Sequence, residues 1–225
     1  MKHTFFIKDW LNSFLSLLFP HCCVVCGRPL AKGEECLCIM CNINLPRTNY
    51  HLRKDNPVER LFWGQIPLER ATSFFFYRKG SDFRQILHQL KYGGKKEVGI
   101  IMGRYMAAEL SDSGFFEGVD VIIPIPLHKK KQQIRGYNQS ECIARGIAAV
   151  TGITVCVESV VRRKNTETQT RKSVFERWEN VDGIFELNHA DSLTGKHILI
   201  VDDVLTTGAT TIACASRLAE VEGTR

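Results

Sequence analysis

The segment ILIVDDVLTTGAT, at residues 198–210, constrains the fold more than any other part of the sequence. Four apolar, mostly branched residues in a row are typical of a strand that is buried on both faces, as in a parallel sheet covered by helices. Asp202 and Asp203 follow this strand directly. Because open parallel sheets bind ligands at the carboxyl ends of their strands, we expect the two carboxylates at the ligand-binding edge.

The residues after the two acids predict an anion site. Gly208 lets the backbone approach a ligand closely, and the unpaired amides and the dipole of a helix N-terminus favour negative charge. The neighbouring carboxylates would repel a bare phosphate. A sugar phosphate fits better, because its hydroxyls donate to the acids while its phosphate lies at the helix start. The purely structural alternative is that Asp203 is only a residue at the entry to the helix and that the threonines cap the helix.

Strands and helices alternate in the rest of the C-terminal part. Apolar spacing predicts helices at 82–92, 97–110, 138–152 and 209–219, and strands at 70–78, 119–126, 153–161, 183–187 and 197–203. In the helix at 138–152, we expect Asn138 to be the N-cap and Gly152 to end the helix. This alternation predicts an α/β fold with a mostly parallel sheet and helices on both faces. We expect an amphipathic helix at 1–20, a cysteine-rich module at 21–46, a linker at 47–69 and the α/β domain at 70–225.

Residues 1–20 combine an apolar helical face with interrupting charges. The run is too short and too charged for a membrane span, and no small-residue cleavage site follows it. Packing on the body of the protein is therefore favoured over a peripheral position on a membrane surface. The apolar face would contain Phe6, Trp10, Phe14, Leu17 and Leu18.

Six of the nine cysteines lie within residues 22–41, in an arrangement that contains two CxxC pairs. Two such pairs can complete a closed tetrahedral site, which predicts a structural Zn²⁺ ion. Redox-active cysteines and an iron–sulfur cluster are the alternatives. Paired cysteines without an export signal favour a reducing compartment, so we expect a cytoplasmic protein. The predicted ligands are Cys23, Cys26, Cys38 and Cys41, and the spacing leaves out Cys22 and Cys36.

The formal charge of +6 comes from residues 80–172, which hold 15 Lys and Arg against 9 Asp and Glu. Such an excess favours an anionic ligand, either a phosphate-rich small molecule or nucleic acid. One basic segment follows the predicted strand at 119–126. A second, at 162–183, includes Arg162 and Lys164 and either closes over a polyphosphate as a lid or lines a groove for single-stranded nucleic acid. Tyr137 and Trp178 are available for stacking in such a groove.

Residues 198–210 resemble the phosphoribosyl pyrophosphate signature of type I phosphoribosyltransferases. The resemblance implies that Asp202 and Asp203 contact the ribose hydroxyls. It also implies that the 5′-phosphate is bound by Thr206, Thr207, Gly208, Ala209 and Thr210. In these enzymes the loop after the first core strand contacts pyrophosphate, which implies that role for the segment containing His128, Lys129 and Arg135.

Several motifs together resemble the ComF family of bacteria over about residues 20–220. They are the two CxxC pairs, LKYGG, PIPLHKKKQQIRGYNQSE, RRKNTETQTRKS, ERWENVDGIF and ILIVDDVLTTGAT. The resemblance implies a zinc ribbon joined to a type I phosphoribosyltransferase-like domain. In some members it also implies a role in handling single-stranded DNA during natural transformation, which makes DNA-uptake proteins expected partners.

Three functions are consistent with these patterns. One is a transferase that binds phosphoribosyl pyrophosphate with Mg²⁺, although no residue stands out as a base for an acceptor. Another is a binding protein for single-stranded DNA that keeps the phosphoribosyl pyrophosphate pocket. The last is a regulator that responds to phosphoribosyl pyrophosphate.

Overall fold

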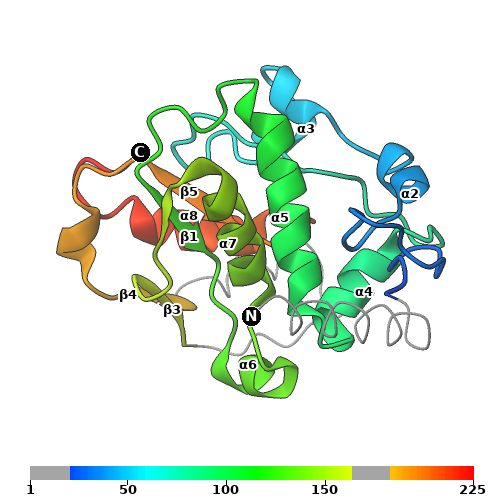
Figure 1. Cartoon of the computed structure of the whole chain (residues 1–225). Helices are drawn as coiled ribbons and strands as arrows, with labels where there is room; N and C mark the ends of the chain where they lie inside the picture. The colour runs from blue at the N-terminus through cyan, green and yellow to red at the C-terminus, as the bar shows by residue number, and fades with distance from the viewer. Residues whose placement is uncertain (1–20, 164–182) are drawn as a thin grey trace, which may run out of the picture.

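A computed structural model describes residues 21–163 and 183–225 of the chain (Figure 1). The predicted helix at 1–20 lies outside the described residues, as do most of the predicted lid segment, including Lys164, and the predicted stacking residue Trp178. In the part of the chain that is described, no helix is long and apolar enough to cross a bilayer.

A three-stranded parallel sheet forms the centre of the described chain. Strand β1 (Val121–Pro124) lies between β2 (Thr154–Val155) and β5 (Ile198–Val201), and both neighbours are parallel to it. Strands β3 (Val160–Arg162) and β4 (Phe185–Leu187) form a separate antiparallel pair. The expected α/β class with a parallel sheet is confirmed. The strand predicted at 153–161 is divided, because a bend separates β2 from β3.

Both faces of the sheet are covered. Ile123 of β1 belongs to a core cluster with residues of α8 (Ala209–Leu218). Its neighbour Ile122 belongs to a second cluster, with residues of α7 (Gln139–Thr151) and α5 (Lys96–Ser111). Successive residues of a strand point to opposite faces, so β1 joins the two layers. Figure 1 shows α5 and α7 side by side in front of the sheet.

Glycines allow α5 and α7 to cross closely. A Cβ atom added at Gly146 of α7 would lie 2.1 Å from the carbonyl oxygen of Ile100, and one at Gly103 of α5 would lie 2.2 Å from that of Ile143. Any larger residue would therefore force the helices apart. The crossing fixes α7, whose N-terminal end faces the carboxyl end of β5.

The cysteine module packs on α4 (Arg84–Tyr92) and α5 rather than standing apart from them. One hydrophobic cluster joins Cys23 and Leu37 of the module to Ile86 of α4 and Met102 of α5. The module contains one short helix, α2 (Ile39–Ile43). Through this cluster the module holds α4 in place.

Residues 47–69 contain a 3-10 helix, η1 (Tyr50–Leu52), and α3 (Pro57–Arg60). Asn56 and Glu59 form a capping box at the start of α3. Phe62 packs against Ile212 of α8 in a small core cluster. The predicted domain boundaries at 20, 46 and 69 stay predictions.

The strand predicted at 70–78 is wrong. This segment forms only an isolated bridge, between Phe75 and Arg47. Its aromatic side chains pack instead: Phe74 and Phe75 lie against the cluster of the cysteine module, and Phe76 meets the ring of Tyr50 edge to face. An apolar run can be buried through its side chains without a partner strand, which a sequence pattern does not distinguish. The described chain also contains the 3-10 helix η3 (Ala190–Leu193), which precedes β5.

Candidate functional site

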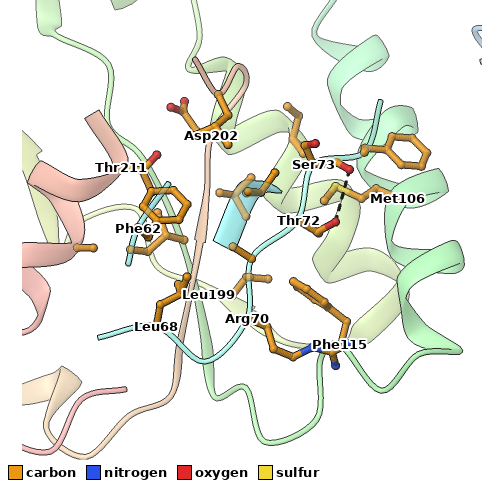
Figure 2. A pocket seen from close by; sticks show the side chains of 18 of the residues that line it. Phe62, Leu68, Arg70, Thr72, Ser73, Met106, Phe115, Leu199, Asp202 and Thr211 are labelled. Carbon is orange, nitrogen blue, oxygen red and sulfur yellow. Dashed lines mark hydrogen bonds between the residues drawn. The ribbon is translucent and has the colours of Figure 1, made fainter. Parts of the chain in front are cut away.

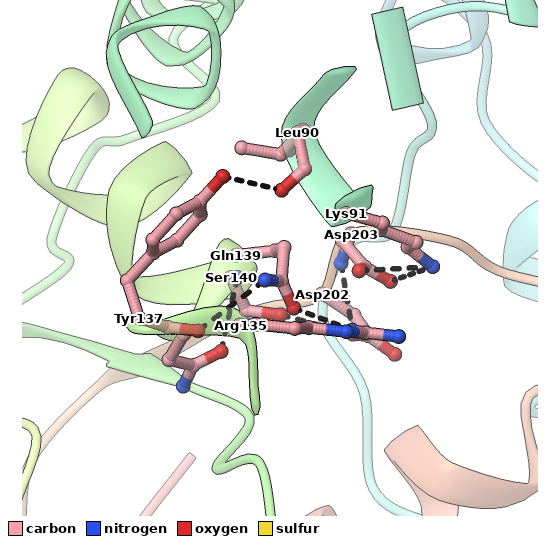
Figure 3. Close-up of polar contacts among 9 residues, drawn as sticks. Leu90, Lys91, Arg135, Tyr137, Gln139, Ser140, Asp202 and Asp203 are labelled. Atoms are coloured by element: carbon pink, nitrogen blue, oxygen red, sulfur yellow. Dashed lines mark hydrogen bonds and ion pairs between the residues drawn. The ribbon is translucent and has the colours of Figure 1, made fainter. Parts of the chain in front are cut away.

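The two predicted ligand-binding acids lie at the end of β5, beside the start of α7 (Figure 3). Oδ1 of Asp202 accepts hydrogen bonds from Oγ of Ser140 at 3.1 Å and from the backbone N–H of Asp203 at 2.8 Å. The carboxylate of Asp203 forms an ion pair with Lys91, with its oxygens 3.0 and 3.1 Å from Nζ. The two acids therefore have different partners.

The environment of Asp202 changes its acidity. Burial raises the pKa of Asp202 from 3.8 to about 6, and the charge of Asp203 acts in the same direction. The hydrogen bonds from the Asp203 amide and from Ser140, together with the charge of Lys91, limit this rise. A ligand hydroxyl that donates to Asp202 would favour the ionised form.

The start of α7 is tied to the sheet by Asn138. Its side-chain oxygen accepts a hydrogen bond from the Ser140 amide at 3.2 Å, which confirms its predicted role as an N-cap. Its amide group donates to the carbonyl oxygen of Ile125, just after β1, at 3.0 Å. These two contacts hold Ser140 opposite Asp202. At the other end of α7, Gly152 has the predicted helix-ending conformation, with a φ of 74°.

The loop after the acids leads into α8 at Gly208, which has a φ of 77°. No side chain caps this helix, so the structural alternative of threonine caps is not observed. Thr206, Thr207 and Thr210 are exposed, and Ala209 is the first residue of the helix. A Cβ atom at Gly208 would lie 3.1 Å from the ring of Phe62, in addition to the strain of a positive φ. The phosphate-binding role of these residues stays a prediction.

The basic segment after β1 forms a helix, α6 (Lys129–Arg135), where the sequence suggested a loop. The ring of His128 caps it by accepting a hydrogen bond from the Lys130 amide at 3.3 Å. Lys129 is exposed at its first position. Arg135, at its end, donates to Oε1 of Gln139 at 2.6 Å.

Arg162, the last residue of β3, is partly buried. Burial lowers the pKa of its guanidinium, and the negative charge of Asp202 opposes that change. This charge interaction relates Arg162 to the acid pair. Lys164 lies outside the described residues, so its predicted role stays a prediction.

Lys91 is a site residue that the sequence did not identify, and Ser140, the partner of Asp202, is another. Lys91 lies in the last turn of α4, and 112 positions separate it from its partner Asp203. The available signal was the LKYGG motif, which marks a helix end and contributes to the family resemblance. Nothing in that motif alone indicates which residue the lysine contacts.

An apolar cavity of about 700 Å³ borders the acids on the side of the segment at 66–77 (Figure 2). Leu68, Phe115 and Leu199 contribute to its walls, and Asp202 lies at its margin. This volume is in the range of small-molecule pockets. At its far end, Arg225 forms two backbone hydrogen bonds with residues 196 and 198, of 3.1 and 2.8 Å.

The four predicted metal ligands come together. The Sγ atoms of Cys23, Cys26, Cys38 and Cys41 all lie within 4.8 Å of one another. The Sγ atoms of Cys26 and Cys38 are 3.7 Å apart, close to the roughly 3.8 Å that a tetrahedral ion with Zn–S bonds of about 2.3 Å requires. The donor set and its geometry therefore fit a metal such as zinc.

Thiol acidity differs among the four cysteines. Arg28 donates a hydrogen bond to Sγ of Cys26 at 3.5 Å, and this contact is the main reason why the pKa of Cys26 is lowered to about 6. Thiolates are the form that binds metals. Burial raises the pKa of Cys36 to about 12, and it also raises the pKa of the cluster member Cys41, so position rather than acidity separates Cys36 from the cluster. Cys22 and Cys36 are outside the four-cysteine cluster, as the spacing indicated.

Comparison with known proteins places this geometry in context. Residues 136–225 match the family model described as the phosphoribosyl transferase domain. The chain is 29% identical to the DNA utilization protein YhgH of Shigella flexneri over 217 residues, which are 90% of this chain and 92% of the relative. No solved structure matches the chain.

Two competence proteins are also similar. The competence protein ComFC of Bacillus subtilis is 26% identical over 203 residues, covering 88% of this chain and 72% of the relative. Competence protein F of Haemophilus influenzae is 34% identical over 92 residues, which are 40% of each chain. These relatives confirm the resemblance that the sequence motifs indicated.

Replacing Asp202 with asparagine should remove a pH dependence of stability. The pKa of Asp202 is about 6 in the folded chain and 3.8 for an ordinary aspartate. Between about pH 4 and 6, the folded state therefore keeps a proton on Asp202 that the unfolded state has already released. Stability therefore falls as the pH rises through this window. The free energy of unfolding of Asp202→Asn, relative to the unmodified chain, should rise by about 2–3 kcal/mol from pH 4 to pH 7.

Urea denaturation at stepped pH would measure this difference. Asp112→Asn, at an exposed position after α5, is the matched control and should show a constant difference. A constant difference for Asp202→Asn would contradict the raised pKa.

The cysteine cluster should bind one zinc ion per chain. We expect Cys38→Ser to lose the metal and to melt at a lower temperature, because a ligand is removed from a closed four-sulfur site. Metal analysis of the purified protein and thermal denaturation would measure both effects. Cys22→Ser, at an exposed position outside the cluster, should keep the metal. Full zinc content in Cys38→Ser would show that the site is assigned wrongly.

Proposed function

We propose that this chain, a ComF-type homologue with a phosphoribosyltransferase domain, binds phosphoribosyl pyrophosphate and acts in the cytoplasm in the uptake or use of single-stranded DNA. One observation carries the ligand assignment: Asp202 and Asp203 directly follow strand β5, and the loop after them leads into the N-terminus of α8, which no side chain caps. Sugar hydroxyls need acceptors and a phosphate needs donors. A phosphorylated ribose uses both at this strand end.

In this proposal each part of the ligand has its own partners. Asp202 and Asp203 accept hydrogen bonds from the ribose hydroxyls. The 5′-phosphate accepts hydrogen bonds from the loop and the first turn of α8, where backbone amides lack partners within the helix. Gly208 permits the close approach of the backbone. The residues in contact with the phosphate would be Thr206, Thr207, Gly208, Ala209 and Thr210.

The basic residues around the acids would bind the pyrophosphate. Arg135 and His128 lie at opposite ends of α6, Lys129 is exposed beside His128, and Arg162 interacts with the charge of Asp202. The carboxylates and the ligand phosphates offer the oxygen donors that Mg²⁺ prefers, so Mg²⁺ would accompany the ligand and neutralise part of its charge. Lys164 would join these residues from the segment outside the described residues.

Binding rather than transfer is the core of the proposal. The acids, the glycine loop and the basic residues provide positioning and charge stabilisation, which a transferase, a sensor and a DNA-handling protein would all use. A transferase also requires a group that activates its acceptor, and the sequence assigns none. The apolar cavity beside Asp202 is where we would place an acceptor if transfer occurs.

The DNA role is supported by two observations. Relatives over most of the chain are named as a DNA utilization protein and a competence protein. The positive charge is concentrated in residues 80–172, and α6 presents Lys129 and Lys130 on the surface. Single strands bind to basic grooves mainly through their phosphates.

Calorimetry with phosphoribosyl pyrophosphate and Mg²⁺ tests the ligand assignment. We expect binding by the unmodified chain and a loss of at least about tenfold in affinity for Asp203→Asn, because a charge-assisted hydrogen bond to the ribose is lost. The exposed Asp112→Asn should bind as the unmodified chain does. No heat with the unmodified chain, or equal heat with Asp203→Asn, would refute the assignment.

Salt titration tests the DNA role. Affinity for a labelled single strand should fall linearly on logarithmic axes as salt rises, with a slope of about −0.7 for each phosphate contact. Replacing both Lys129 and Lys130 with glutamine should weaken binding. It should also make the slope shallower, by the amount expected for the loss of about one to two phosphate contacts. The matched control replaces exposed Lys54 and Lys79 in the same way. Binding that is independent of salt would exclude a phosphate-binding surface.

A further inference from the structure

The last turn of α4 contacts two parts of the candidate site, the acid pair and the segment at 135–137, through three consecutive residues. The carbonyl oxygen of Leu90 accepts a hydrogen bond from the hydroxyl of Tyr137 at 2.7 Å, as Figure 3 shows. Lys91 pairs with Asp203. The ring of Tyr92 lies beneath the guanidinium of Arg135, with 5.6 Å from Cζ to the ring centroid. This turn is therefore part of the wall of the site.

These contacts place Lys91 between two predicted subsites. On one side it meets Asp203, the acid expected to contact the ribose. On the other, the preceding and following residues contact Tyr137 and Arg135, which belong to the segment expected to contact pyrophosphate. A group that joins the ribose to the pyrophosphate would pass close to the ammonium group.

Lys91 retains the capacity to bind a ligand. An ammonium group has three N–H donors, and the two oxygens of Asp203 account for two contacts, at 3.0 and 3.1 Å. The lysine side chain is 22% exposed and that of Asp203 is 13% exposed. The pair is thus partly shielded from water, which strengthens its electrostatic interactions, but it is not sealed off from a ligand.

The shape of the ligand fixes which group meets Lys91. If the 5′-phosphate lies at the start of α8 and the ring hydroxyls lie on the acids, the group on C1 lies on the side of the ring away from the 5′-phosphate. Lys91 reaches Asp203 from the last turn of α4, an element separate from the loop that leads into α8 (Figure 3). We therefore place the C1 substituent beside Lys91.

We propose that Lys91, while paired with Asp203, is a ligand-binding residue that donates its remaining N–H to the pyrophosphate on C1. This inference rests on the proposed binding of phosphoribosyl pyrophosphate and adds a residue that distinguishes this ligand from a sugar phosphate without the pyrophosphate. One lysine then offsets the repulsion between a carboxylate and a neighbouring diphosphate. Its position is maintained by Ile86, five residues earlier in α4, which is buried in the cluster of the cysteine module.

The test compares two ligands in calorimetry, phosphoribosyl pyrophosphate and ribose 5-phosphate, with Mg²⁺ at a fixed concentration. In Lys91→Met, the dissociation constant of phosphoribosyl pyrophosphate should rise at least about tenfold, because a charge-assisted contact is lost. That of ribose 5-phosphate should change less than about threefold, since this ligand lacks the group that Lys91 binds. Lys91→Arg, which keeps the charge, should stay within about threefold for both ligands.

Controls separate this result from loss of structure. Lys95→Met makes the same charge change at an exposed position after α4 and should leave both affinities unchanged. Circular dichroism and thermal melting would establish that each variant folds. If Lys91→Met does not fold, Lys91→Gln takes its place in the comparison.

Other outcomes reject the proposal in distinguishable ways. Equal weakening of both ligands in Lys91→Met would mean that Lys91 acts only by positioning Asp203. Unchanged affinity for phosphoribosyl pyrophosphate would show that Lys91 does not contact it. If the unmodified chain binds neither ligand, the proposed function itself fails. If it binds both equally, the pyrophosphate has no subsite and only the ribose 5-phosphate part of the proposed function survives.

Discussion

The parallel pairing of β1 with β5 determines where every part of the candidate site lies. Four residue pairs hold the two strands in register, so their carboxyl ends meet at one edge of the sheet. The chain leaves β1 toward α6 and α7 and leaves β5 through Asp202 and Asp203. Ser140 and Asp202, which are 62 positions apart, come within hydrogen-bond distance as a result. The pairing thus brings the basic segment and the acids to one place.

A second constraint connects the cysteine module to the same place. The module shares a hydrophobic cluster with α4 and α5, and α4 ends at Leu90, Lys91 and Tyr92, which contact the site. A metal bound by the four cysteines would order residues that contain little apolar material of their own. It would thereby stabilise the surface on which α4 rests. The module can support the ligand site through packing, independently of any contact with nucleic acid.

Local patterns in the sequence predicted most of the fold, and long-range contacts account for what was missed. The run at 198–201 with its two acids, the cap at Asn138 and the end of α7 at Gly152 follow from rules that span a few residues, and the structure has all three. The spacing of the cysteines likewise predicted the four-cysteine cluster. The pairing of Lys91 with Asp203 depends on how α4 packs, which no local pattern encodes. The prediction of a strand at 70–78 was wrong for the same reason, because the aromatic side chains of this segment pack against other parts of the chain and the segment has no partner strand.

The two adjacent acids differ electrostatically, and this difference determines which ligands suit the site. Lys91 compensates the charge of Asp203, whereas burial raises the pKa of Asp202 to about 6. A ligand that brings only negative charge would raise the pKa of Asp202 further and would be disfavoured there. A ligand that donates two hydroxyls satisfies both acids and can place its phosphates among the amides and cations on either side. In the proposed function, the acid pair would therefore favour a diol with phosphates at its two ends over a simple polyphosphate.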